Sequence, residues 1–391
     1  MELEQSSNSD EDPAPFFPWD LLPFDLQGSI LSLLPVSTLA RCQSVSRSWR
    51  STIRSPAFLS SFRRNPDDLY LIPFTDNVSP AAYHPSRDRW LTLGLPPSFV
   101  FAIASDGGLL LALDDHSRLA VFDLFSGATL ARLPDMASVL QPYVVALIDE
   151  FPSAHYKIVA VSTGDRVYSQ VFDSRSGRWE IKGQFPGQFA VLGNAVFLDG
   201  LLFVLSEGPD HLLTFDPVGG DWNLVDMAMP PVVCSHILDS EDRLFLVGGV
   251  EDVGCIARVG IWELDLPKKE WRLICFMPDG FFRIFGGRRL EHFWTVARMG
   301  IVCFYNTRDT TVLMFDLPAR RWWWPLPCPA IPRRRRFWFG HAIEPRMDLL
   351  KGSNGRLIVS TQRSGYLLDC RQSDDGGSKR HHISLVDHTV T

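Results

Sequence analysis

The residues most able to take part in chemistry lie close together near the C-terminal end of this 391-residue chain. The stretch 322–339 (WWWPLPCPAIPRRRRFWF) joins three tryptophans to a run of arginines and a further tryptophan, namely Arg333, Arg334, Arg335, Arg336 and Trp338. Arginine forms charge-assisted hydrogen bonds with carboxylates, and arginine and tryptophan dominate the binding energy of protein interfaces. Because the whole chain has a formal net charge of −7, this local positive charge predicts a surface that binds an acidic segment of a target protein.

A second stretch of similar composition, 279–289 (DGFFRIFGGRR), contributes Phe281, Phe282, Arg288 and Arg289. If both stretches are loops on one face, they form a single target-binding surface. Three other interpretations of the arginine run stay open: a nuclear-import patch, a strip that contacts nucleic-acid phosphates, and a solvated loop whose tryptophans belong to the core. The net negative charge argues against nucleic acid as the general partner of the surface.

Motifs typical of enzymes are absent from the sequence. It contains no His-Glu-x-x-His, no Gly-x-Ser-x-Gly, no Gly-x-x-x-x-Gly-Lys and no Cys-x-x-Cys. The ten histidines are scattered, and only His381 and His382 are adjacent. We therefore expect a protein that is not an enzyme and that binds no cofactor and no metal.

The cysteines and the hydropathy pattern indicate where the protein resides. Seven cysteines are dispersed along the chain, an odd number typical of reduced thiols in a cytosolic or nuclear protein. No apolar run approaches the roughly 18 residues that a membrane-spanning helix needs. We expect a location in the nucleus, the cytoplasm or both, with no membrane partner.

An eight-residue pattern recurs through the central part of the chain: an aromatic or aliphatic residue, usually Asp, turn residues, and Trp. The copies begin at Tyr83, Phe122, Phe172, Phe215, Leu264 and Phe315, at intervals of 39, 50, 43, 49 and 51 residues. In the second copy Thr129 replaces the tryptophan. The intervals match one four-stranded propeller blade. Each octad predicts a tight hairpin, with Asp bonded to turn amides and Trp filling the space between neighbouring blades.

The octads predict six blades, with seven as the other possibility. Only one clear strand, 69–73, precedes the first octad, whereas the strands 356–361 and 365–370 have no octad after them. We expect these C-terminal strands to complete the first blade, since this would close the ring and remove its free edges. A β-sandwich with repeated turns is the alternative fold.

The segment 19–62 contains more apolar residues than three short helices can bury on their own. Apolar residues recur at helical spacing, and Pro35 ends the first helix. Ser37 and Ser46 are the predicted N-caps of the second and third helices, and Pro56 follows the end of the third. We expect several leucines to be exposed until a partner covers them.

This segment resembles the F-box. The matching elements are Leu22-Pro23, Leu34-Pro35, the Leu-x-Arg-Cys helix at 39–42 and the Val-Ser-Arg-x-Trp-Arg sequence at 45–50. The resemblance implies docking onto the Skp adaptor of a Skp–cullin–F-box ubiquitin ligase. The residues expected to carry the docking are Leu22, Pro23, Leu26, Ile30, Leu31, Leu34, Pro35, Leu39 and Val45. A three-helix cap packed on the following domain is the alternative.

The octads resemble degenerate kelch repeats of plant F-box/kelch proteins, with the Gly-Gly signature kept at Gly248-Gly249. Residues 278–327 also resemble the later part of such proteins near the unusual-floral-organs branch. The resemblance implies an all-α, three-helix F-box followed by an all-β, kelch-type β-propeller. The expected divisions are a disordered acidic tail (1–15), the F-box (16–62), the propeller (63–371) and a flexible tail (372–391).

The implied function is that of a substrate-recognition subunit. The F-box would bind a Skp-type adaptor and through it a cullin, and the propeller would hold a protein target for ubiquitination. The alternative is a kelch interaction scaffold or transcriptional co-regulator that acts outside a ligase. The sequence identifies neither the target nor the propeller face that binds it.

Overall fold

The structure is a computed structural model, and it describes twelve stretches of the chain. These are residues 19–62, 65–75, 81–93, 95–123, 127–137, 144–163, 166–185, 191–207, 211–309, 311–328, 337–345 and 359–360. Both predicted tails, 1–15 and 372–391, and the predicted strand 365–370 lie outside them. None of the helices in these stretches is both long and apolar enough to cross a bilayer.

The N-terminal segment folds into four short helices preceded by a 3-10 turn. They are η1 (Trp19–Leu21), α1 (Phe24–Ser32), α2 (Val36–Val45), α3 (Arg47–Ile53) and α4 (Pro56–Ser61). Their shared core contains Leu31, Leu39, Ile53 and Phe58. The prediction of three helices was wrong, because Pro56 begins a fourth helix instead of following the last one. Proline is well suited to a first helical turn, and the Ser55 hydroxyl accepts the Phe58 N–H as its N-cap.

The predicted N-cap of the third helix is confirmed and that of the second is wrong. The Ser46 hydroxyl accepts the Trp49 N–H at 3.0 Å, as an N-cap does. Helix α2 begins two residues earlier than expected, with Pro35 and not Ser37 at its N-cap position. Proline has no hydroxyl to offer, and the Val36 N–H instead donates to both carboxylate oxygens of Asp68, each at 2.9 Å. This bond links the N-terminal helices to the 3-10 turn η2 (Pro66–Asp68).

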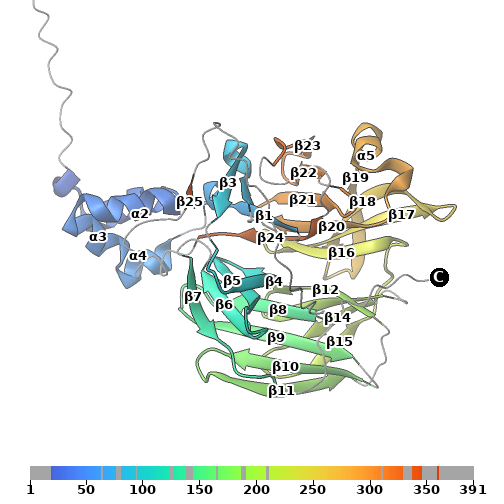
Figure 1. Cartoon of the computed structure of the whole chain (residues 1–391), viewed down its shortest axis with the longest axis horizontal. Coiled ribbons are helices and arrows are strands. Elements are labelled where there is room, and N and C mark those ends of the chain that lie inside the picture. The colour runs from blue at the N-terminus through green and yellow to red at the C-terminus, as the bar shows by residue number, and fades with distance from the viewer. Residues whose placement is uncertain are drawn as a thin grey trace, which may run out of the picture. The chain divides into compact units, whose positions relative to one another are not determined.

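Six antiparallel sheets form a propeller, which confirms the predicted fold and blade number. Figure 1 shows the sheets following one another from cyan to orange along the chain. In the order of the strands from the centre outward, blade 1 is β24 (Phe337–Ile343), β1 (Tyr70–Thr75), β2 (Ala81–His84), β3 (Arg89–Leu93) and β25 (Val359–Ser360). Blade 2 is β4 (Phe99–Asp106), β5 (Leu109–Asp114), β6 (Leu119–Asp123) and β7 (Ala128–Arg132). Blade 3 is β8 (Val144–Asp149), β9 (Tyr156–Thr163), β10 (Val167–Asp173) and β11 (Arg178–Phe185).

The later three blades repeat the same order. Blade 4 is β12 (Val191–Leu198), β13 (Leu201–Glu207), β14 (His211–Phe215) and β15 (Trp222–Val225). Blade 5 is β16 (Val233–Ser240), β17 (Arg243–Asp252), β18 (Cys255–Asp265) and β19 (Glu270–Phe276). Blade 6 is β20 (Phe293–Arg298), β21 (Ile301–Asn306), β22 (Val312–Asp316) and β23 (Arg321–Trp323).

Every octad is the hairpin between the third and fourth strands of a blade. The first residue of the pattern pairs with the last, as in Phe172 with Trp179 and Phe215 with Trp222. The octad aspartates bind the turn amides, as predicted. The Asp173 carboxylate accepts the Arg175 N–H at 2.7 Å. Equivalent bonds run from Val218 to Asp216, from Lys268 to Asp265 and from Ala319 to Asp316.

Three of the octad tryptophans form hydrogen bonds that connect their blade to the one before it. The Trp179 indole N–H donates to the Pro134 carbonyl at 3.0 Å, across the boundary between blades 3 and 2. The Trp222 N–H donates to the Ser169 hydroxyl of blade 3 at 3.1 Å. The indole N–H of Trp90 likewise bonds to the Leu326 carbonyl after blade 6. The tryptophans therefore lie between blades, as the repeat predicted.

A C-terminal strand closes the ring, but the strand at the centre of blade 1 is not the one expected. Strand β24 pairs with β1 in the register Tyr70 with Ile343 and Leu71 with Ala342. The predicted strand 356–361 contributes β25, which pairs with β3 at the outer edge of the blade. Residues 337–339 belong to the stretch 322–339, which the sequence analysis expects to be a loop, and the structure places them in a strand. Gly340 fits there because a side chain at this position would collide with the ring of Tyr305.

The antiparallel order of the strands divides the propeller into two faces. Octad hairpins and the turns between first and second strands lie on one face, which we call the octad face. The turns between second and third strands and the connections between blades lie on the other, the linker face. Because Tyr70 pairs with Ile343 at the end of β24, the chain enters blade 1 from the F-box at the octad face.

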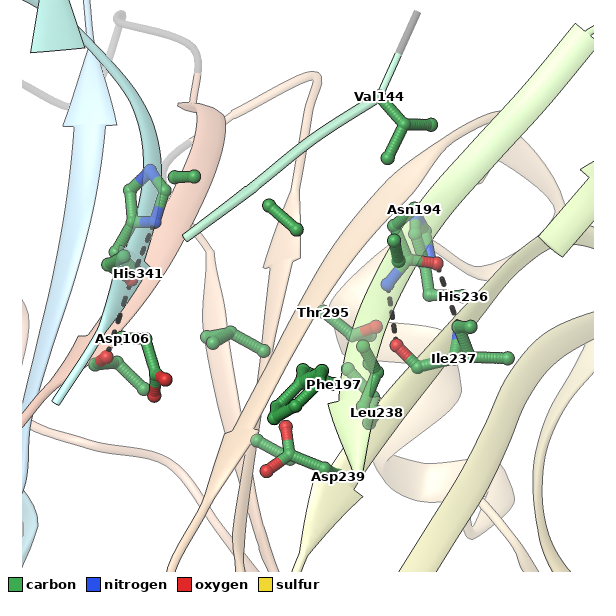
Figure 2. Close-up of a pocket in the computed structure, with 18 of the residues that line it drawn as sticks. Asp106, Val144, Asn194, Phe197, His236, Ile237, Leu238, Asp239, Thr295 and His341 are labelled. Atoms are coloured by element: carbon green, nitrogen blue, oxygen red, sulfur yellow. Dashed lines mark hydrogen bonds between the residues drawn. The ribbon is translucent and has the colours of Figure 1, made fainter. Parts of the chain in front are cut away.

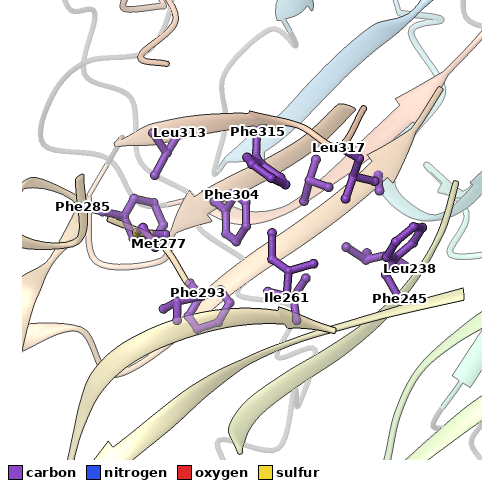
Figure 3. Close-up of a cluster of buried hydrophobic side chains, with 14 of the residues drawn as sticks. Leu238, Phe245, Ile261, Met277, Phe285, Phe293, Phe304, Leu313, Phe315 and Leu317 are labelled. Atoms are coloured by element: carbon purple, nitrogen blue, oxygen red, sulfur yellow. The ribbon is translucent and has the colours of Figure 1, made fainter. Parts of the chain in front are cut away.

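A large apolar cluster joins blades 5 and 6. It contains Phe245 and Ile261 of blade 5, Phe304 and Phe315 of blade 6, and Phe285 from the connection between them (Figure 3). The Gly-Gly signature of the kelch repeat lies beside this cluster in β17. A side chain at Gly248 would approach the Val232 Cβ to 2.6 Å, so that glycine is needed for the blade to pack closely.

Candidate functional site

The first candidate surface is the outer side of helix α1. Leu26, Ile30 and Leu33 lie at helical positions i, i+4 and i+7, which places them on one side of α1 and its C-cap. Their exposed fractions are 49%, 43% and 75%. Gln27 and Leu31, about 100° away, are buried against the other helices. An exposed apolar stripe on so small a helical domain indicates a site for a partner.

The nine residues predicted to bind the adaptor fall into three groups. Pro23, Leu26, Ile30 and Val45 are exposed, whereas Leu22, Leu34 and Pro35 are half-buried. Leu31 and Leu39 have almost no exposed surface and belong to the F-box core. These two can position the exposed stripe but cannot contact a partner without a rearrangement of the helices. Adaptor binding by the other seven stays a prediction.

Three exposed apolar residues are not among the nine predicted to bind the adaptor. Leu21, Phe24 and Leu33 are 80%, 58% and 75% exposed. The helical spacing from Leu26 and Ile30 leads to Leu33 or Leu34, and the other two residues flank the predicted Leu22-Pro23 pair. They enlarge the apolar surface around the start and the end of α1.

A buried carboxylate is attached to this helical domain at the start of α2. Asp68 has almost no exposed surface, and both of its oxygens accept the Val36 N–H. Burial raises the pKa of this carboxyl to about 7, although the hydrogen bond from Val36 acts in the opposite direction. The Asp68 carboxyl group, which links η2 to the start of α2, therefore titrates close to physiological pH.

The second candidate surface is built on helix α5 (Asp279–Phe285), which connects blades 5 and 6 on the linker face. Phe285 anchors the helix because its side chain is fully buried in the apolar cluster of Figure 3. The N–H of Phe282 and that of Gly286 each bond to a carbonyl four residues earlier, at Pro278 and Phe282. The helix is therefore held in a fixed position by its own hydrogen bonds and by one buried ring.

The two predicted stretches, 279–289 and 322–339, are in contact. The Phe281 ring stacks on Trp324 with centroids 5.5 Å apart and lies 6.3 Å from Trp322. Ile284 and Leu326 remain more than half exposed beside these rings. The sequence analysis expected adjacent loops, and the structure provides a short helix packed against the tryptophan segment.

Arginines surround this apolar surface. Arg283, Arg288 and Arg289 are exposed and form no ion pair with the described residues. We call the surface formed by α5, the turn η4 (Gly287–Arg289) and Trp324 the α5 surface. Its exposed arginines and half-buried aromatic rings include the residue types found at protein-binding hot spots.

The nine predicted target-binding residues do not all lie on the α5 surface. Arg333, Arg334, Arg335 and Arg336 lie outside the described residues. Trp338 belongs to strand β24 at the centre of blade 1 and not to a loop. Phe281, Phe282, Arg288 and Arg289 are together on the α5 surface. Arg283 and Trp324 join them there, although neither was among the predicted target-binding residues.

Comparison with protein-family models finds the F-box domain, which matches residues 19–61. The F-box/kelch-repeat protein At5g43190 of Arabidopsis thaliana is 28% identical over 349 residues, covering 81% of this chain and 84% of the relative. F-box only protein 6 of the same plant is 28% identical, covering 84% of this chain and 74% of the relative. Protein UNUSUAL FLORAL ORGANS, also from Arabidopsis thaliana, is 22% identical, covering 80% of this chain and 79% of the relative.

Proposed function

We propose, from the premise that this chain is a plant F-box/kelch protein, that it is the substrate-recognition subunit of a Skp–cullin–F-box ubiquitin ligase. The F-box binds a Skp-type adaptor, which attaches the chain to the cullin. The propeller binds a protein target and keeps it close to the conjugating enzyme. The chain contributes proximity, and the covalent chemistry belongs to the other subunits.

The observation that carries this proposal is the exposed stripe on α1. Leu26 and Ile30 stand on the side of the helix opposite the F-box core, where a folded protein gains nothing from exposing them. Because about half of each side chain is already covered, burying the rest of one such side chain stabilises a complex by about 0.7–1.5 kcal/mol. Binding of an adaptor to this side of α1 would explain why Leu26 and Ile30 are apolar although they are exposed in the free chain.

Co-expression with a Skp adaptor tests the proposal. We expect the wild-type chain to form a one-to-one complex in size-exclusion chromatography. The double substitution Leu26→Asp/Ile30→Asp should abolish it, because it places two charges in an apolar interface. Both residues are exposed in the free chain, so the unfolding temperature of the variant should match that of the wild type.

The matched control is Val253→Asp, which introduces the same charge at a 94% exposed apolar residue of the propeller. Its complex with the adaptor should persist. If a well-folded wild-type chain forms no complex, or if the double variant binds as tightly as the control, the adaptor-binding role is refuted.

The target-binding part of the proposal rests on the α5 surface. Its exposed arginines lack acidic partners among the described residues, and its rings are held by Phe285 and Trp324. An acidic, partly apolar segment of a target complements such a surface in charge and in hydropathy.

Charge reversal tests this part separately. In plant cells, Arg283→Glu/Arg288→Glu/Arg289→Glu should stabilise the same proteins that accumulate when the chain is depleted or the cullin is inhibited. Adaptor binding should be unchanged, and Arg166→Glu, an exposed arginine of blade 3, is the control. If the triple variant still promotes turnover of those proteins, the target binds elsewhere. If cullin inhibition has no effect on any of them, the chain acts outside a ligase.

A further inference from the structure

The hairpin between β17 and β18 in blade 5 has the longest strands of the propeller. The two strands contain 10 and 11 residues, whereas no second or third strand of another blade in the described part of the chain exceeds 8. They stay paired as far as Asp252 and Cys255, so the turn consists of Val253 and Gly254. Turns between second and third strands lie on the linker face, so this hairpin projects from the face that carries α5 (Figure 1).

Val253 is an unusual residue for the tip of a hairpin. Its φ is +49° and that of Gly254 is +74°, as in a type I′ turn, where Asn-Gly is the preferred pair. A β-branched residue is disfavoured in this left-handed region, because its Cβ crowds the backbone carbonyl that follows. Val253 is also 94% exposed, more than any other large apolar side chain of the described residues. Folding gains nothing from valine at this position, which indicates that the side chain contacts a partner.

The base of the hairpin is held firmly beside the α5 surface. Ile256 is buried in the same apolar cluster as Phe285 and Leu290, which flank η4. Blade 5 is in turn tied to blade 4 at the centre of the ring, where the Asn194 side chain accepts the Ile237 N–H at 2.9 Å and donates to the Ile237 carbonyl (Figure 2). The tip is therefore fixed in position relative to α5.

The tip and the α5 surface have opposite charges. Glu251 and Asp252 precede Val253, are exposed, and form no ion pair with the described residues. On the α5 surface, exposed arginines surround Ile284, which is 63% exposed. An acidic tip with an apolar centre thus complements a basic surface with an apolar centre, yet the two do not pair within one chain.

We propose that the linker face binds a second copy of this chain, with the hairpin tip of each copy on the α5 surface of the other. Such an exchange requires the two complementary surfaces to lie beside each other on one face, and the apolar cluster shared by Ile256 and Phe285 meets this requirement. The contact is isologous, so it closes as a two-fold dimer and does not continue into a filament. Both surfaces are small, so the dimer is weak and reversible. The F-box takes no part, and each copy still binds one adaptor.

The dimer has a regulatory consequence that rests on the proposed function. A target that binds the α5 surface competes with the hairpin tip of the second copy. The dimer would then be a form of the receptor that does not bind its target, and it would dissociate when the target is abundant.

Sedimentation velocity of the purified full-length chain between about 1 and 100 μM tests the inference. We expect a monomer–dimer equilibrium that shifts toward the monomer when salt is added, since salt screens exposed charges. Val253→Asn supplies the Asn-Gly pair that a type I′ turn prefers and removes the apolar contact. The variant should unfold no earlier than the wild type. Its dimer dissociation constant should rise about a hundredfold, about tenfold for each of the two equal contacts.

A charge exchange tests which surfaces meet. Glu251→Arg/Asp252→Arg makes the tip basic, like the α5 surface. Arg283→Glu/Arg288→Glu/Arg289→Glu makes the α5 surface acidic, like the tip. Each variant alone should remain monomeric at concentrations where the wild type dimerises, because like charges face one another. An equimolar mixture of the two should restore the dimer, since each tip then meets a surface of opposite charge.

The matched control is Val218→Asn, at a 72% exposed valine of an octad turn, which should dimerise like the wild type. The inference is overturned if the wild type is monomeric at about 100 μM, if Val253→Asn dimerises as well as Val218→Asn, or if the mixture of charge variants stays monomeric. Glu251→Arg/Asp252→Arg leaves the α5 surface intact, so it should promote target turnover at least as well as the wild type. Loss of turnover in this variant, with a dimer that behaves as described, would refute competition at the α5 surface and leave the dimer standing.

Discussion

Replacing Arg298 by methionine gives the strongest test of how the ring is held together. Arg298 belongs to blade 6, and its three carboxylate partners belong to blades 5, 1 and 2. Asp106 also accepts the Asp149 N–H of blade 3 at 2.9 Å. One guanidinium thus organises ionic contacts across most of the ring, including the boundary between the last and the first blade.

The expected cost follows from the burial of the cluster. The exposed fractions of the side chains are 15% for Arg298, 19% for Asp106, 31% for Asp239 and 6% for Glu344. Burial alone would lower the pKa of Arg298, but the three carboxylates raise it above its ordinary value, so the guanidinium stays charged. Removing one member of a buried ion pair typically costs about 3–5 kcal/mol, because the other charge stays buried without a partner. With an unfolding entropy of about 2.1 cal/mol/K per residue, a domain of this size should lose roughly 5–9 °C in its unfolding temperature.

Differential scanning calorimetry of the full-length chain at pH 7.5 and pH 5 measures the effect. In Arg298→Met, the unpaired carboxylates favour protonation in the folded state, so the variant binds more protons folded than unfolded. Its stability should then fall as the pH rises, and its deficit against the wild type should be larger at pH 7.5 than at pH 5. Arg166→Met, at an exposed arginine bonded only to Gln184 in the described structure, should change stability by at most about 0.5 kcal/mol. If Arg298→Met unfolds within about 2 °C of the wild type at both pH values, the reasoning is refuted.

Three other substitutions test separate parts of the structure. Because burial raises the pKa of Asp68 to about 7, the contribution of this group to the free energy of unfolding is present at low pH and is lost as the pH rises through 7. Chemical denaturation should therefore show that the stability of the wild type relative to Asp68→Asn falls from pH 5 to pH 8. A difference that stays constant with pH would contradict the raised pKa. Gly107→Ala should destabilise the chain by more than about 1 kcal/mol, since Gly107 has φ +56° and a side chain would collide with Asp149. Gly200→Ala, at φ +82° with open space around it, should cost less, and equal losses in thermal unfolding would exclude the collision. Trp179→Phe removes the hydrogen bond to Pro134 and should lower the free energy of unfolding by about 1 kcal/mol. Trp179→Ala also removes the ring and should lower it by about 3–5 kcal/mol. Equal unfolding temperatures of the two variants would show that the ring does not fill the boundary between blades.

The parts of the fold that the sequence predicted depend on local chemistry. An octad brings together a turn, an aspartate that binds its amides and a tryptophan that pairs with the first residue, all within eight positions. The pairing of Phe172 with Trp179 and the bond from Arg175 to Asp173 follow from that spacing alone. Because each blade repeats these contacts, the number of octads also predicted the number of blades.

The parts that were missed depend on contacts between distant residues. Strand β24 is recognisable only through its partner β1, more than 260 positions earlier in the chain, and the adjacent arginines favoured a loop. The N-cap of α2 is supplied by Asp68, 32 residues after Val36. The sequence alone does not distinguish the buried Leu31 and Leu39 from the exposed Leu26 and Ile30, because all four residues are apolar and lie at helical spacing. Contacts among the folded helices decide which side of α1 faces inward.

The rigidity of the ring connects the two proposed binding surfaces. The chain enters from the F-box at the octad face, through Leu69 and Tyr70, whereas α5 stands on the linker face. A target bound at the α5 surface is therefore held to the F-box only through the body of the propeller. Proximity catalysis depends on the orientation of the held groups, so the ion pairs of Arg298 with Asp106, Asp239 and Glu344 and the closure by β24 should matter for ubiquitin transfer and not for target affinity. A weakened ring such as that of Arg298→Met should accordingly bind the adaptor and the target at low temperature, yet support slower transfer to the target.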